Sequence, residues 1–117
     1  MNKSTYLSAA ILAAIMFLTG CTSKESAIRE ALNYDQTITR QTASRAGLWD
    51  AFFGLSDEKK ADYVRNLKRV PLSGCPSDFK DAYQRHIAAW ESRNPSAISS
   101  TWADVLATAS LHGVDWK

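Results

Sequence analysis

Cysteine, proline and glycine are scarce in this chain, which has two, three and five of them among its 117 residues. Two cysteines are too few for a disulfide-rich scaffold or for a zinc site made of four cysteines. The 14 Lys and Arg nearly balance the 12 Asp and Glu, and a net charge of +2 is too small to indicate nucleic acid as the main partner. The hydrophobic content of 45% is that of one ordinary globular domain.

The short motifs of common enzymes are also missing. The sequence contains no Ser-x-x-Lys, Gly-x-Ser-x-Gly, phosphate-binding-loop or His-Glu-x-x-His pattern. No two of the histidines, cysteines and nearby acids have the spacing of a metal-ligand pair. We therefore expect no metal and no other cofactor, and we interpret the protein as non-enzymatic.

The N-terminus has the pattern of an export signal. Lys3 gives a positive start, and Leu7–Leu18 is an apolar run without a charged residue. This run is well short of the about 20 apolar residues that span a bilayer, so it indicates a cleavable signal and not a permanent transmembrane helix. It ends in Leu18-Thr19-Gly20-Cys21. This order of an aliphatic residue, two small residues and a cysteine resembles the lipobox of bacterial lipoproteins.

In that family the cysteine sulfur receives a diacylglyceryl group, and a signal peptidase then cuts just before the cysteine. The resemblance implies that residues 1–20 are removed and that acyl chains on Cys21 hold the protein in the membrane. Residues 21–24 then form a short tether, and residues 25–117 form a single domain. Thr22 stands where an aspartate retains enterobacterial lipoproteins at the inner membrane, which implies an outer-membrane location facing the periplasm. An inner-membrane location and a conventional secretory signal are the alternatives.

The rest of the chain is typical of a helical protein, because it has no sustained strand-like alternation and no Asn-Gly or Asp-Gly hairpin signal. Four amphipathic segments with short connections predict an all-α fold, a small bundle of about four helices. The first segment runs from Thr22 to Gly47. Ser56, followed by two acids, starts the second. Asn94-Pro95 breaks the third, so we expect the last helix to begin near Ser99 or Ser100.

Apolar positions that recur at helical spacing are expected to face the core. They are Ala27, Ile28, Ala31, Leu32 and Ile38, then Ala61, Val64, Leu67 and Val70, then Phe79, Tyr83, His86, Ile87 and Trp90, and finally Trp102, Val105, Leu106 and Ala109. We also expect Trp116 to fold back onto the bundle, because an indole left in water would not bury its apolar area.

Cys75 is the candidate reactive thiol. It precedes a helix, whose dipole can lower a thiol pKa. His86 follows it by 11 residues, mostly along one helix, which places the two about 16 Å apart and excludes a direct pair. Only His112 is left as a partner. We favour the alternative that Cys75 is a small buried residue that packs its loop onto the bundle; an intermolecular disulfide is the other alternative.

Trp49, Phe52 and Phe53 place three aromatic residues within five positions, between Gly47 and Gly54. Such a segment either covers one end of the bundle or forms a contact surface for a partner. If the protein binds a partner, we expect the binding surface in this segment.

These features predict a lipid-anchored periplasmic helical protein that acts as a non-enzymatic accessory or binding module for another cell-envelope protein. Two alternatives remain open. One is a thiol-dependent enzyme or redox protein that uses Cys75. The other is a binder of peptidoglycan or lipid that uses exposed tryptophans.

Overall fold

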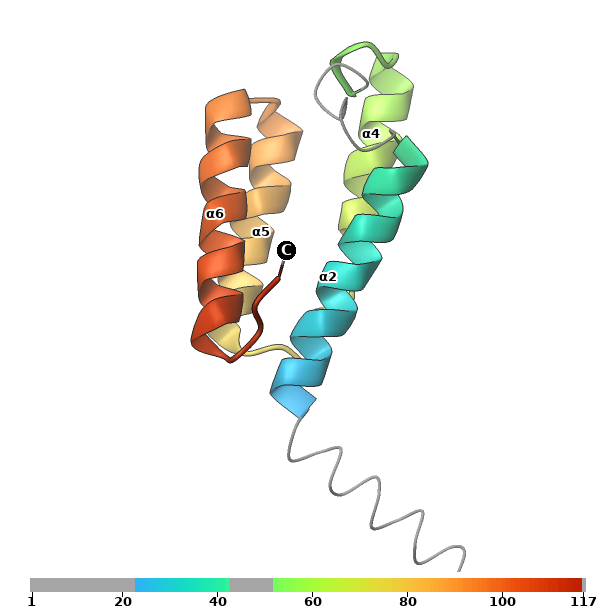
Figure 1. Ribbon diagram of the computed structural model, residues 1–117. Helices are drawn as coiled ribbons and strands as arrows, with labels where there is room; N and C mark the ends of the chain where they lie inside the picture. Colours follow the sequence, from blue (N-terminus) through green and yellow to red (C-terminus); the bar gives the residue numbers. More distant parts are fainter. Residues whose placement is uncertain (1–22, 43–51, 117) are drawn as a thin grey trace, which may run out of the picture.

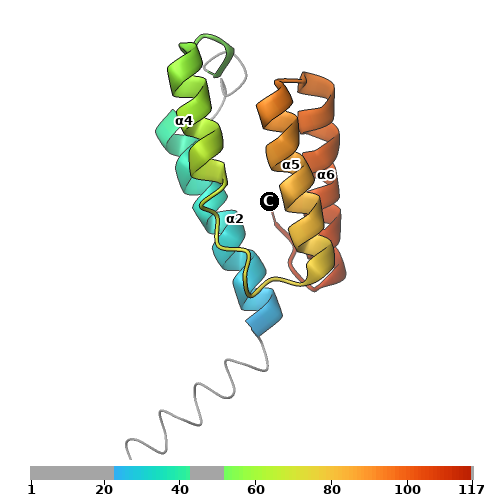
Figure 2. The same cartoon turned by 180° about the vertical axis from the view of Figure 1, so that it is seen from behind.

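The helices in the described part of the chain are arranged as two pairs. The computed structural model describes residues 23–42 and 52–116. Its helices are α2 (Ser23–Thr42), α4 (Asp57–Leu67), α5 (Ser77–Ser92) and α6 (Pro95–Leu111), and these two ranges contain no strand. α2 lies beside α4, and α5 lies beside α6 (Figure 1, Figure 2). The prediction of an all-α fold, a small bundle of about four helices, is confirmed.

α2 buries the apolar stripe that its periodicity predicts. Ile28, Leu32 and Ile38 are buried, and their spacing places them on one face of the helix. The helix begins at Ser23, so it includes part of the predicted tether. The predicted end at Gly47 lies outside the described residues.

α4 starts where its capping signal predicts. The Ser56 hydroxyl accepts a hydrogen bond from the Lys59 backbone N–H (3.3 Å), which satisfies one of the free donors of the first turn. Val64 is buried as expected, but Ala61 is exposed and Tyr63 is buried instead. The buried face is rotated in this way because α4 packs against both α2 and α5.

The connection from α4 to α5, residues 68–76, packs against the beginning of α2 (Figure 2). Gly74 approaches this helix so closely that a Cβ atom added to it would lie 3.3 Å from the Ala27 Cβ. Val70 and Cys75 are buried beside it. The loop therefore contributes to the core as well as joining the two helix pairs.

The turn between α5 and α6 overturns the prediction that the last helix begins near Ser99 or Ser100. Arg93 ends α5 with a left-handed φ of 55°. The Asn94 side chain then accepts a hydrogen bond from the backbone N–H three residues ahead (3.2 Å). Pro95 occupies the first turn of α6, where its missing N–H costs no helical hydrogen bond. Asn94-Pro95 therefore starts a helix as well as ending one.

The segment after α6 returns to the core. Gly113, with a φ of 84°, turns the chain back at a left-handed conformation that glycine adopts without strain. Val114 is fully buried, and Trp116 is partly buried against the core. This segment runs between the two helix pairs (Figure 1). The prediction that Trp116 folds back is confirmed.

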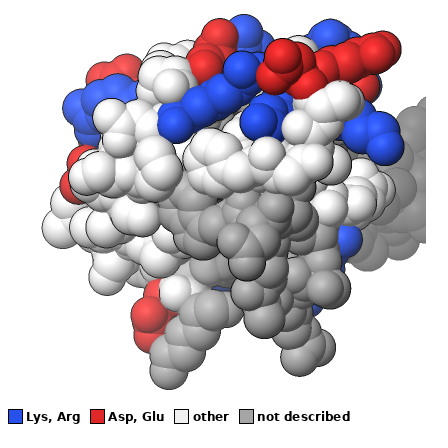
Figure 3. Space-filling view, turned by 90° about the horizontal axis from the view of Figure 1, so that it is seen from above, with Lys and Arg blue, Asp and Glu red and all other residues white. Residues whose placement is uncertain are grey.

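The charged side chains at one end of the molecule lie mainly along one edge, seen from above in Figure 3. An ion pair between Arg93 and Asp57 (3.7 Å) links the end of α5 to the start of α4 there. Both side chains are exposed, so the pair contributes little to stability. No helix within the described ranges combines the length and the apolar character needed to cross a bilayer.

Candidate functional site

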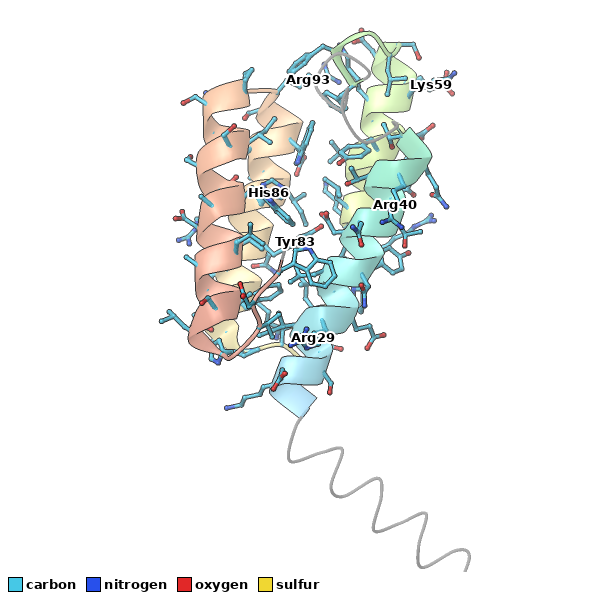
Figure 4. All side chains as sticks on the ribbon, viewed as in Figure 1. Arg29, Arg40, Lys59, Tyr83, His86 and Arg93 are labelled. Carbon is cyan, nitrogen blue, oxygen red and sulfur yellow. The ribbon has the colours of Figure 1, made fainter. Side chains whose placement is uncertain are left out.

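A cleft of about 600 Å³ lies between the two helix pairs. This volume is within the range of about 300–1,000 Å³ that is typical of ligand sites. Figure 4 shows Tyr83 and His86 on the side of α5 that faces α2 and α4. The described residues that line the cleft come from all four helices and from the segment after α6: Asp35, Gln36, Thr39, Tyr63, His86, Trp90, Ile98, Ser99, Trp102, Leu106 and Trp116.

Asp35 places a buried carboxyl group in the wall of this cleft. It lies on α2 and is only 7% exposed. It accepts a hydrogen bond from the Tyr83 hydroxyl of α5 (2.6 Å), so this bond joins the two helix pairs. Burial raises the pKa of Asp35 to about 6, although the hydrogen bond from Tyr83 lowers it in part. At neutral pH the Asp35 carboxyl group is therefore mainly ionised, although its buried surroundings favour the neutral form.

His86 lies in the same cleft and is held as a neutral ring. The Trp90 indole N–H donates to His86 Nε2 (3.1 Å), so Nε2 accepts and the ring proton is on Nδ1. Nδ1 then donates to Thr101 Oγ1 (2.9 Å), and that hydroxyl donates to the Ala97 carbonyl oxygen (2.6 Å). Burial lowers the pKa of His86 to about 4. A second ring proton, on Nε2, would also point at the Trp90 N–H, so the hydrogen bonds favour the neutral ring as well.

These hydrogen bonds favour binding over catalysis in the cleft. A histidine that activates a nucleophile takes a proton from a hydroxyl group, whereas His86 donates its proton to Thr101. Both ring nitrogens are engaged in this way, so neither has a free lone pair for a substrate. The chemistry that the arrangement offers is an anionic group between apolar and aromatic walls.

All three tryptophans in the described ranges, Trp90, Trp102 and Trp116, line the cleft. Trp90 is buried, whereas Trp102 and Trp116 are partly exposed. The Trp102 ring lies against His86, with ring centroids 5.2 Å apart. The sequence placed Trp90 and Trp102 in the core; Trp102 packs against the core and also faces the cleft. Large flat rings of this kind bind apolar groups, sugar faces and organic cations.

The aromatic segment was predicted either to cover one end of the bundle or to form a contact surface, and of its described residues Phe52 belongs to the core. Phe52 is fully buried and packs on Tyr63 and Trp90, with ring centroids 5.4 and 4.7 Å away. Phe53 is 38% exposed. Trp49 lies outside the described residues. Phe52 cannot present its ring to a partner, which corrects that part of the prediction.

Cys75 has the surroundings of a packed apolar residue. It is 7% exposed, and its Sγ lies 3.9 Å from the Pro71 carbonyl oxygen. Burial raises the pKa of the thiol and outweighs the opposite effect of Lys80. His112, the remaining candidate partner, has its Nε2 2.9 Å from an Asp78 carboxylate oxygen. These features disfavour a thiolate at Cys75.

Asp35 was missed by the sequence reasoning, although the sequence carries a signal for it. The residue stands three positions after Leu32 and three before Ile38, and both of these are buried. An acid at a core-facing position of an amphipathic helix is unusual, because a buried carboxylate needs a partner. Its hydrogen bond to Tyr83 depends on tertiary contact and has no signal in the sequence.

Cys21 lies outside the described residues. Within the described ranges, no group of three or more His, Cys, Asp and Glu residues is placed to hold a metal ion. No family model matches the chain, and no curated protein or solved structure matches it either.

Proposed function

We propose that the protein is a lipid-anchored, non-enzymatic binding module of the bacterial cell envelope, facing the periplasm, and that the cleft is its binding site for another envelope protein. The observation that carries this proposal is a cleft of about 600 Å³ lined by tryptophans and by a buried carboxyl group. Burial of a charge costs stability. A strongly shifted pKa at a cavity is therefore typical of a functional site.

The lipid anchor in this proposal rests on the lipobox-like Leu18-Thr19-Gly20-Cys21. Because α2 begins at Ser23, an anchor on Cys21 would hold the domain close to the membrane surface. Mass spectrometry of the protein from membranes tests this directly. We expect a mature chain that begins at acylated Cys21, and we expect Cys21→Ser to leave the signal uncut; an unmodified Cys21 would contradict the anchor.

Crosslinking in intact cells tests the binding site. A photoreactive residue replaces Ser99, an exposed residue at the cleft, and a matched control replaces Leu111, which is 81% exposed near the end of the same helix. We expect one dominant envelope protein to be trapped from position 99 and not from position 111. Equal products from both positions, or none from either, would contradict a binding site in the cleft.

A binder of peptidoglycan or lipid is the second candidate, because Trp90, Trp102 and Trp116 line one cleft. Titration of muropeptides or phospholipid against the intrinsic tryptophan fluorescence tests it. A saturable shift that Trp102→Ala abolishes would favour this function. The thiol-dependent alternative has less support, because burial raises the pKa of Cys75.

A further inference from the structure

The Asp35 carboxylate has no opposite charge beside it in the described part of the protein. No Lys or Arg is found among the described residues that line the cleft, and none of the ion pairs between described residues includes Asp35. His86 is the only basic side chain in that lining, and its hydrogen bonds to Trp90 and Thr101 hold it neutral. The neighbour that Asp35 does have, the Tyr83 hydroxyl, carries no charge.

This arrangement selects a cation over other ligands. A buried carboxylate gains most from a charge-assisted hydrogen bond to an ammonium or guanidinium group. Trp102 and Trp116 line the same cleft and add apolar surface for the neighbours of such a group. A neutral ligand would cover the carboxylate without pairing it, and an anionic ligand would meet repulsion.

We propose that the cleft receives a Lys or Arg side chain of the partner polypeptide, which pairs with the Asp35 carboxylate while apolar neighbours of that side chain pack on Trp102 and Trp116. This inference rests on the proposed function, since it names what the envelope partner presents. A volume of about 600 Å³ exceeds what one basic side chain fills. The remaining apolar walls favour a short polypeptide segment as the occupant.

Binding of short peptides to the full-length protein, reconstituted in vesicles of zwitterionic lipid, tests the inference. The probes are acetyl-Leu-Lys-Leu-amide, the uncharged acetyl-Leu-norleucine-Leu-amide and butylammonium, followed by tryptophan fluorescence. We expect the lysine peptide to bind at least tenfold more tightly than the norleucine peptide. We expect butylammonium, which lacks the apolar neighbours, to bind more weakly than the lysine peptide.

Variants of the cleft separate charge from apolar contact. Asp35→Asn should remove the tenfold preference for lysine, whereas Asp81→Asn, a change at an exposed carboxylate of α5, should leave it intact. Trp102→Ala keeps the carboxylate and should weaken both peptides by a similar factor. Equal binding of the two peptides to wild type, or a preference that survives Asp35→Asn, would overturn the inference. Butylammonium binding as tight as that of the lysine peptide would overturn the choice of a polypeptide.

Two further results distinguish the possible failures. Arg45 and Lys117 are basic residues outside the described ranges. If Arg45→Gln or Lys117→Gln binds the lysine peptide more tightly than wild type, the chain supplies its own cation and the inference is wrong. If position 99 traps one envelope protein in cells and Asp35→Asn does not reduce this trapping, the inference fails while the proposed function stands.

Discussion

Asp35 and His86 are buried in one cleft, and burial changes their pKa values in opposite directions. It raises the pKa of Asp35 from 3.8 to about 6 and lowers that of His86 from 6.5 to about 4, in each case favouring the neutral form. The stability linked to Asp35 is fully present below pH 3.8 and is lost as the pH rises through about 6. The stability linked to His86 is present above pH 6.5 and is lost as the pH falls through about 4.

Asp35→Asn should therefore stabilise the protein at pH 7. An Asn carbonyl oxygen can still accept the Tyr83 hydroxyl hydrogen bond, and no charge has to be buried. A shift of about two pKa units corresponds to a gain of at most about 3 kcal/mol in the free energy of unfolding. Urea unfolding at pH 7 and at pH 3.5 measures it, and the gain should vanish at the lower pH. Asp81→Asn serves as the exposed control. A loss of stability of Asp35→Asn at pH 7 would show that a cation pairs with the Asp35 carboxylate.

The dependence of stability on pH gives a second prediction. Since the contributions of Asp35 and His86 change in opposite senses over nearly the same range, the wild-type free energy of unfolding should vary little between pH 4 and 6.5. In Asp35→Asn only the histidine contribution remains, so stability should rise by about 3 kcal/mol across that range. Urea unfolding in half-unit steps of pH measures both profiles. The double variant Asp35→Asn/His86→Gln should restore a flat profile, and a flat profile in Asp35→Asn alone would contradict the lowered pKa of His86.

At the scale of the helices, the end of α5 carries a removable strain. Arg93 is the only described residue other than glycine with a positive φ, and a Cβ atom costs about 1 kcal/mol in this conformation. Arg93→Gly should raise the free energy of unfolding by up to about 1 kcal/mol. Arg93→Ala is the matched control, because it also removes the exposed ion pair with Asp57 but keeps the Cβ atom. Equal unfolding midpoints for the two variants in urea would contradict the argument.

The start of α6 gives the opposite case, a cap whose loss costs stability. Asn94→Ala removes the side-chain acceptor of the Ala97 N–H, which should lower the free energy of unfolding by about 1 kcal/mol. Asn94→Ser retains a capping oxygen and should lose much less. Thermal unfolding of the three proteins measures the difference, and similar melting temperatures for the Ala and Ser variants would show that the cap is not what starts the helix.

The helices could be predicted from the sequence because their signals are local. Ser56 before two acids and the aromatic face of residues 79–90 located α4 and α5. The predicted start of α6 was wrong because the same two residues, Asn-Pro, end the preceding helix and cap the next one. Asp35 could have been found from its place in the apolar stripe of α2. The cleft could not have been found in this way. Its shape depends on how far the two helix pairs diverge, and no local sequence pattern encodes this divergence.

For the whole molecule, the strength of packing differs between the two helix pairs. Among the described helices, the contact between α5 and α6 is the most extensive, and these two helices are adjacent in sequence. We expect amide hydrogens in α5 and α6 to exchange most slowly and those of α2 to exchange faster, because α2 can detach without opening that interface. Hydrogen exchange followed by mass spectrometry on peptides from each helix measures the order. Uniform exchange across the four helices would show that the pairs open only together.

The position of residues 114–116 between the two helix pairs affects the order in which the protein can fold. Val114 is fully buried and Trp116 packs against the core, so the core closes only when the segment that follows α6 is in place. A chain exported as proposed would emerge with α2 first, at a time when α5, α6 and Trp116 are not yet available to cover its apolar stripe. A single helix of this kind is marginal in water. On the far side of the membrane, the fold would therefore be completed only after residues 114–116 have crossed as well.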